Sequence, residues 1–143
     1  MNITADTNVL ARAVLQDDPQ QSRIAQQQLK QAELIAVTLP SLCELVWILH
    51  QGAGIARKDI ATAIRALCAS EKVAVNRPAA EAGLAMLESG GDFADGVIAY
   101  EGRRLGGATF VSFDKKAAKL LLKHGRAVRL LEPAPAKDSS RPR

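Results

Sequence analysis

Four acidic residues lie at or near the starts of predicted helices, and they are the residues best suited to chemistry. They are Asp6, Glu44, Asp95 and Asp114. Carboxylates that lie close together raise each other's pKa unless a positive charge lies among them. A hard divalent cation such as Mg2+ or Mn2+ prefers oxygen ligands and would supply that charge. Such an ion can activate a bound water and offset charge on a phosphoryl group, so the set predicts hydrolysis of a phosphodiester.

Alternating strands and helices must position these acids. Short apolar and β-branched runs at residues 3–5, 34–38, 73–75, 109–113 and 127–131 predict strands, and the segments between them have helical spacing. Strands that alternate with helices form right-handed crossovers and a parallel sheet covered on both faces. We therefore predict an α/β fold, a three-layer α/β/α sandwich around a central, mostly parallel sheet of about five strands.

The positions of the acids relative to the strands predict a shared cleft. Asp6 and Asp114 each directly follow a predicted strand, whereas Glu44 and Asp95 lie about one turn inside a predicted helix. Ligands of open α/β sheets bind in the crevice outside the carboxyl ends of the strands. If the strands of Asp6 and Asp114 are neighbours, all four acids face that crevice. This adjacency is a hypothesis about the topology.

Helix capping is the alternative role at the first strand-to-helix junction. Asp6, Thr7 and Asn8 all have side chains that accept hydrogen bonds from the free N–H groups of a helix N-terminus. Because three further acids are predicted at the same edge, we assign Asp6 to a metal site and the capping role to Thr7 and Asn8.

The other acids have similar alternatives. Asp92 and Asp95 have the spacing of a variant capping box, and Asp114 could cap the helix that follows it. Glu44 could be a solvated helix position, although it lies in a strongly apolar helix. We interpret Asp92 as a helix cap that also supports the carboxylates of the site without being a metal ligand itself.

Composition predicts one globular domain. The chain has 143 residues, of which 48% are hydrophobic and 24% charged. No apolar stretch approaches the roughly 20 residues that span a bilayer, and no signal-type segment is recognised at the start, so we expect a cytoplasmic protein without a membrane partner. We predict a domain over residues 1–132 and a flexible basic tail over residues 133–143.

The remaining metal-binding residue types are scattered. Cys43 and Cys68 read as small buried hydrophobes, and His50 and His124 are isolated, so zinc has no ligand set. Aromatic residues make up only 3% of the chain, which is too few for an extended base-stacking platform. A nucleic acid would therefore be held mainly through its phosphates, in keeping with the net charge of +4.

Four cations close to the acids in sequence are candidates for that contact. They are Arg12, Lys115, Lys116 and Lys119. Their alternative role is a solvated helix face, and the same choice is open for Arg103 and Arg104.

Four ordered motifs resemble those of one nuclease family. The motifs are ADTNVL around Asp6, PSLCELVW around Glu44, GGDFADGVIA around Asp95 and TFVSFDKKAAKL around Asp114. They resemble the PIN-domain nucleases and, among these, the VapC-type toxins of bacterial toxin–antitoxin modules. The resemblance extends over nearly the whole chain.

The resemblance implies roles for the acids. Asp6, Glu44, Asp95 and Asp114 correspond to the family's acidic quartet. Asp6 and Asp95 are then the direct metal ligands, Asp114 completes the metal shell, and Glu44 orients or deprotonates the attacking water. By the same resemblance, the residues that support the carboxylates through hydrogen bonds are Thr7 or Asn8 and Ser112.

The resemblance also implies an activity and partners. It implies an endoribonuclease that depends on Mg2+ or Mn2+, a homodimer, and inhibition by a small antitoxin protein. Trp47 and the apolar faces beside it are candidates for the dimer contact. The alternative is a PIN-like module that binds RNA or protein without catalysis.

One position departs from the family's pattern. Gly96 stands where similar motifs commonly have Ala or another helix former. Glycine costs about 1 kcal/mol of helix propensity, so we expect a looser turn there without loss of the chemistry.

Overall fold

The structure, a computed structural model, describes residues 1–133. Of the predicted tail at residues 133–143, all but Pro133 lies outside the described residues. The strands are β1 (Asn2–Thr4), β2 (Leu34–Ala36), β3 (Val73–Ala74), β4 (Thr109–Ser112) and β5 (Ala127–Leu130). The helices are α1 (Thr7–Leu15), α2 (Pro19–Gln31), α3 (Leu39–Trp47), the π-helical turn η1 (Ile48–Gly52), α4 (Arg57–Ala69), α5 (Arg77–Glu88), α6 (Phe93–Arg104) and α7 (Lys115–Lys123).

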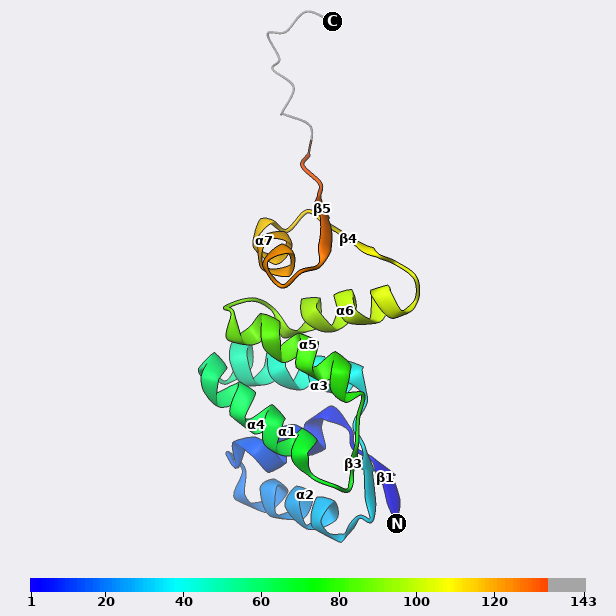
Figure 1. The fold of residues 1–143 in the computed structure, drawn as a ribbon. Coiled ribbons are helices and arrows are strands. Elements are labelled where there is room, and N and C mark those ends of the chain that lie inside the picture. Colours follow the sequence, from blue (N-terminus) through cyan, green and yellow to red (C-terminus); the bar gives the residue numbers. More distant parts are fainter. Residues whose placement is uncertain (134–143) are drawn as a thin grey trace, which may run out of the picture.

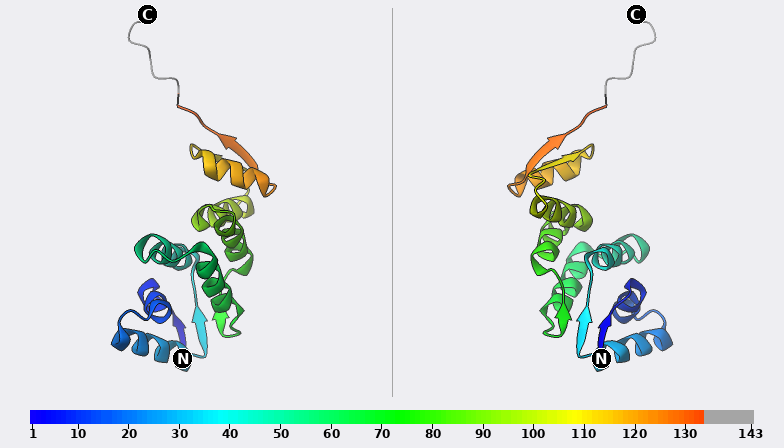
Figure 2. Two further views of the ribbon diagram at one scale, coloured as in Figure 1. Left: turned by 90° about the vertical axis from the view of Figure 1, so that its left-hand side faces the viewer. Right: turned by 90° about the vertical axis from the view of Figure 1, so that its right-hand side faces the viewer.

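The predicted α/β fold with parallel strands is confirmed. Every strand pair is parallel, with Ile3 opposite Ile35 and Ile35 opposite Val73 in the first sheet. In the second sheet Phe110 lies opposite Val128. The five strands are divided, because β1, β2 and β3 form one sheet while β4 and β5 form another. Figure 1 shows α5 and α6 lying between the two sheets, and the views in Figure 2 agree.

The hypothesis that the strands of Asp6 and Asp114 are neighbours is therefore wrong within this chain. The physical reason is a second, smaller core. Met86 of α5, Ala99 of α6 and Leu121 of α7 are buried against one another, and Phe110 and Val128 of the second sheet pack on them. The segment from β4 to β5 thus buries its apolar face against α5 and α6, and β1 pairs with β2 alone.

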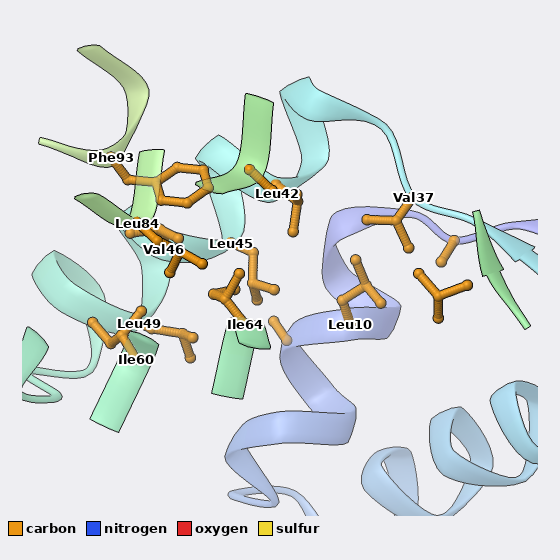
Figure 3. Packing of buried hydrophobic residues seen from close by; sticks show 14 of the residues in the cluster. Leu10, Val37, Leu42, Leu45, Val46, Leu49, Ile60, Ile64, Leu84 and Phe93 are labelled. Carbon is orange, nitrogen blue, oxygen red and sulfur yellow. The ribbon is translucent and has the colours of Figure 1, made fainter. Parts of the chain in front are cut away.

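The main core connects the first sheet to helices α1 and α3–α6. Leu42 and Leu45 of α3 and Leu49 of η1 recur at helical spacing and are fully buried, so this strongly apolar segment supplies one face of the core. Figure 3 shows how the labelled side chains fill the space between Leu10 of α1 and Phe93 of α6. This core fixes the start of α6, where two of the predicted acids lie.

Side-chain caps explain where several helices begin. Asp18 accepts a hydrogen bond from the Gln21 N–H at 3.1 Å, and Pro19 occupies the first helical position. Asn76 accepts from the Ala79 N–H at 3.2 Å.

Gly96 is a packing position between α5 and α6, a role that helix propensity alone does not predict. It is buried, and a Cβ at this position would collide with the Ala82 carbonyl oxygen of α5. The lack of a side chain at Gly96 lowers helix propensity but allows α5 and α6 to come into close contact. Among the described residues, no helix is both long enough and apolar enough to cross a membrane.

Candidate active site

A cavity of about 190 Å3 brings together two of the four predicted catalytic acids. Asp95 and Asp114 both line it, together with Asp92. The other charged or polar residues at the cavity are His50, Gln51, Arg57 and Lys116. The apolar part is formed by Val46, Trp47, Leu87, Phe93 and Ala117, with Gly90 and Gly91 completing the lining.

Asp95 lies in the first turn of α6 and is half-buried. Its pKa is raised above the ordinary value, first by burial and then by the charges of Asp92 and Asp114. Asp92 caps the same helix, because its side chain accepts a hydrogen bond from the Ala94 N–H at 2.9 Å. The capping role expected for Asp92 is therefore confirmed, and its charge also reaches Asp95.

Asp114 is the N-cap of α7. Its carboxylate accepts a hydrogen bond from the Ala117 N–H at 3.1 Å. Its own backbone N–H donates to the Ser112 hydroxyl at 2.9 Å, so Ser112 supports the turn through the backbone of Asp114. The hydrogen bond from Ser112 to the carboxylate, implied by the resemblance, is not the one observed. Asp114 combines capping with a position at the cavity.

Asp6 ends β1 and caps α1. Its Oδ1 accepts a hydrogen bond from the Thr7 N–H at 2.8 Å. The assignment of the cap to Thr7 and Asn8 was wrong, because both residues already lie inside the helix. Thr7 supports the Asp6 carboxylate, although through its backbone N–H. Asp6 is exposed and does not line the cavity of Asp95, and Asn8 lines a separate groove between β1, α1 and α2.

Glu44 is exposed on α3 and also lies outside the lining of the cavity. Its neighbour Cys43 is half-buried, and the pKa of the Cys43 thiol is raised to about 11 by burial and then by the charges of Asp92 and Glu101. The middle of α3 therefore runs beside α6.

One of the four predicted RNA-binding cations lies at the cavity. Lys116 lines it, whereas Lys115 and Lys119 are exposed on α7 outside the lining. Arg12 forms an ion pair with Asp17 at 3.1 Å and lines the separate groove beside β1. Lys116 is thus the cation that the structure brings to the acids.

Three cavity residues were missed as site residues by the sequence reasoning, and a fourth was considered only for a dimer contact. His50, Gln51 and Arg57 were missed, and Trp47 is the fourth. η1 has no sequence signature of its own, so the direction of His50 and Gln51 could not be predicted. The available signal in the sequence was the single tryptophan of the apolar helix, Trp47. The structure shows that this side chain is 63% exposed.

The carboxylates at the cavity are enough for Mg2+ but do not form a complete ligand set. Within residues 1–133, no group of three or more His, Cys, Asp or Glu side chains is arranged to hold a metal ion. Mg2+ usually needs only one or two carboxylates and keeps several waters. Asp95 and Asp114 provide such a pair. The pKa of Asp95 is raised first by burial and then by the charges of Asp92 and Asp114, and a cation would offset those charges.

A comparison with known protein families matches residues 3–121 to the PIN domain. The chain therefore belongs to the PIN-domain family, whose members are generally nucleases that use divalent metals. A search of curated proteins finds no match.

Proposed function

We propose that the protein is an endoribonuclease that depends on Mg2+ or Mn2+ and acts as the toxin of a toxin–antitoxin pair. The observation that supports it most is the cavity in which Asp95, Asp114 and Asp92 lie with Lys116. Membership of the PIN-domain family supports nuclease chemistry at these acids.

Asp95 and Asp114 would hold the metal. When bound, the ion would polarise a water and a phosphoryl oxygen. Lys116 lines the same cavity and would attract the phosphate of the RNA backbone, which the carboxylates alone would repel. Asp92 orders the start of α6 by capping it and so positions Asp95 in the first turn.

Asp6 and Glu44 complete the proposed quartet, by the resemblance to the family's motifs. Asp6 would be a further metal ligand, and Glu44 would orient or deprotonate the attacking water. Both side chains are exposed and lie outside the cavity lining, with Asp6 between β1 and α1 and Glu44 in the middle of α3. Their participation therefore requires that they approach the cavity, which the variants below test.

The toxin role, a homodimer, a cytoplasmic location and inhibition by a small antitoxin protein are part of the same proposal. They are supported by the VapC-like motifs around Asp6 and Asp95. Induced expression should arrest growth of a bacterial host, and Asp95→Asn should relieve the arrest. Equal arrest by both proteins would contradict the toxin proposal.

Cleavage of RNA by the purified protein tests the enzymatic part. We expect products with Mg2+ or Mn2+ and none in excess EDTA, and loss of cleavage in Asp6→Asn. Cleavage that survives both EDTA and Asp6→Asn would contradict a metal-dependent site that includes Asp6.

A second candidate is a non-catalytic module that binds RNA or protein. It is favoured by the separation of Asp6 from the cavity of Asp95. A metal that binds only the folded protein raises its free energy of unfolding by RT ln(1 + [L]/Kd). The non-catalytic module predicts no rise in melting temperature with Mn2+, whereas the nuclease predicts a rise that Asp95→Asn abolishes.

A further inference from the structure

An exposed aromatic ring lies at the edge of the acidic cavity. Trp47 ends α3, is 63% exposed and is the only tryptophan of the chain. It lines the same cavity as Asp95. The lining beside it is apolar, since Val46 and Phe93 contribute to it and are 4% and 1% exposed. Aromatic rings next to a charged groove stack on the bases of single-stranded nucleic acids.

Arg57 offers a hydrogen-bond donor to this part of the cavity. It is the first residue of α4 and lines the cavity. Among residues 1–133, its Nε is the only buried side-chain nitrogen or oxygen without a hydrogen-bond partner. Buried polar groups are normally paired, so a donor of this kind requires an explanation. The Nε itself is buried, so a ligand in the cavity would contact the terminal nitrogens of this planar guanidinium, which suit phosphates and base edges.

The π-helical turn η1 brings two more polar groups to the cavity. His50 and Gln51 both lie in this turn and line the cavity, and their Nδ1 and Nε2 atoms are 3.4 Å apart. π-helical turns are rare and occur frequently at functional sites. An imidazole and an amide are able to hydrogen-bond the edge of an unpaired base.

We infer that Trp47, His50, Gln51 and Arg57 form a subsite for one unstacked base of single-stranded RNA, beside Asp95. This inference rests on the proposed function, because it assigns the place of a nucleotide next to the cleaved bond. The cavity of about 190 Å3 is smaller than the roughly 300–1,000 Å3 of sites for drug-sized ligands. We therefore expect it to take a single unstacked base and not a larger ligand. Trp47 stacks on the base, and Arg57 binds its edge or the adjoining phosphate.

Fluorescence of the one tryptophan measures this binding directly. A short single-stranded RNA is titrated into the full chain in excess EDTA, so that binding is observed without cleavage. We expect a saturable decrease in tryptophan emission, and no decrease with an abasic strand of the same length. The measurement does not depend on catalysis, so it separates the subsite from the nuclease proposal.

Variants at the surface provide the second test. Trp47→Ala has no tryptophan, so its affinity is measured with dye-labelled RNA. The affinity for RNA should fall by about 5- to 150-fold, the range for loss of one base–aromatic stack. Trp47→Phe should restore most of the affinity. Phe113→Ala is the matched control, because Phe113 is 66% exposed but lies outside the cavity. Arg57→Gln should also weaken binding, whereas Arg23→Gln on α2 should not.

Two results would overturn the inference. The first is unchanged affinity in Trp47→Ala together with unchanged emission on adding RNA. The second is a change from dimer to monomer in Trp47→Ala with RNA affinity intact, which would assign Trp47 to a contact between protein chains. Quenching without any metal-dependent cleavage would support the subsite and contradict the nuclease.

Discussion

Gly96 of α6 packs directly against Gly83 of α5. A Cβ at Gly96 would lie 2.9 Å from the Gly83 Cα and would collide with the Ala82 carbonyl oxygen. A Cβ at Gly83 would in turn lie 2.7 Å from the Phe93 ring. The two glycines thus let α5 and α6 approach closely, and α6 carries Asp95 in its first turn.

Replacement of Gly96 by alanine should destabilise the protein. The added methyl group meets backbone atoms, which cannot rotate away, so we expect a loss of about 1–3 kcal/mol in the free energy of unfolding. Denaturation by urea measures it. Gly102→Ala is the control on the same helix, because nothing lies within 4 Å of its Cβ position. That variant should gain about 0.4–1 kcal/mol, and a loss in Gly102→Ala as large as in Gly96→Ala would contradict the account.

Asp6 allows its capping role to be separated from a catalytic one. Asn caps a helix about as well as Asp does, whereas Ala does not. We therefore expect Asp6→Asn to unfold like the wild type and Asp6→Ala to lose about 0.5–2 kcal/mol, as measured by urea denaturation. If Asp6→Asn loses cleavage while its stability is unchanged, Asp6 acts in the chemistry. Cleavage by Asp6→Asn at the wild-type rate would show that Asp6 acts only as a helix cap.

The raised pKa of Asp95 predicts how stability depends on pH without metal. The folded protein favours the protonated carboxyl, so it binds more protons than the unfolded chain between pH 3.8 and the raised pKa of Asp95. The contribution of Asp95 to the free energy of unfolding falls as pH rises through this window and stays low above it. Thermal melts in EDTA should find Asp95→Asn more stable than wild type at neutral pH and similar near pH 3. A stability advantage of Asp95→Asn that shrinks as the pH rises would contradict the burial of Asp95 and its repulsion by the neighbouring acids.

The Cys43 thiol should react slowly at neutral pH. Its pKa of about 11 leaves little thiolate, which is the nucleophilic form. The rate of Cys43 alkylation by iodoacetamide, followed by mass spectrometry, should rise with pH and reach half its maximum near pH 11. Asp92→Asn removes one of the charges that raise the pKa and should move the midpoint down. A midpoint near the ordinary thiol value would contradict burial beside α6.

Local sequence signals predicted the individual elements well. The β-branched and apolar runs at residues 109–113 and 127–131 predicted β4 and β5, and the spacing of Asp92 and Asp95 predicted the cap at the start of α6. These features depend on residues close in sequence, whose periodicity and capping chemistry can be read directly.

The assembly of the elements could not be predicted in the same way. Pairing between strands distant in sequence depends on which apolar faces bury each other, and here Phe110 and Val128 pack on Met86 of α5. This packing keeps β4 away from β1, and so separates Asp114 from Asp6. Asp95 and Asp114 were predicted to meet and do line one cavity, because both lie at the starts of helices beside it.

The rate of RNA cleavage by Asp95→Asn tests the central claim most directly. The wild type, Asp95→Asn and Asp59→Asn are compared with the same single-stranded RNA and the same Mg2+ concentration, and Asp59 serves as an acid of α4 outside the cavity. The account predicts a wild-type rate for Asp59→Asn. For Asp95→Asn it predicts a loss greater than the about 10- to 100-fold that follows mutation of residues that only support a metal ligand. Cleavage by Asp95→Asn at the wild-type rate would contradict it.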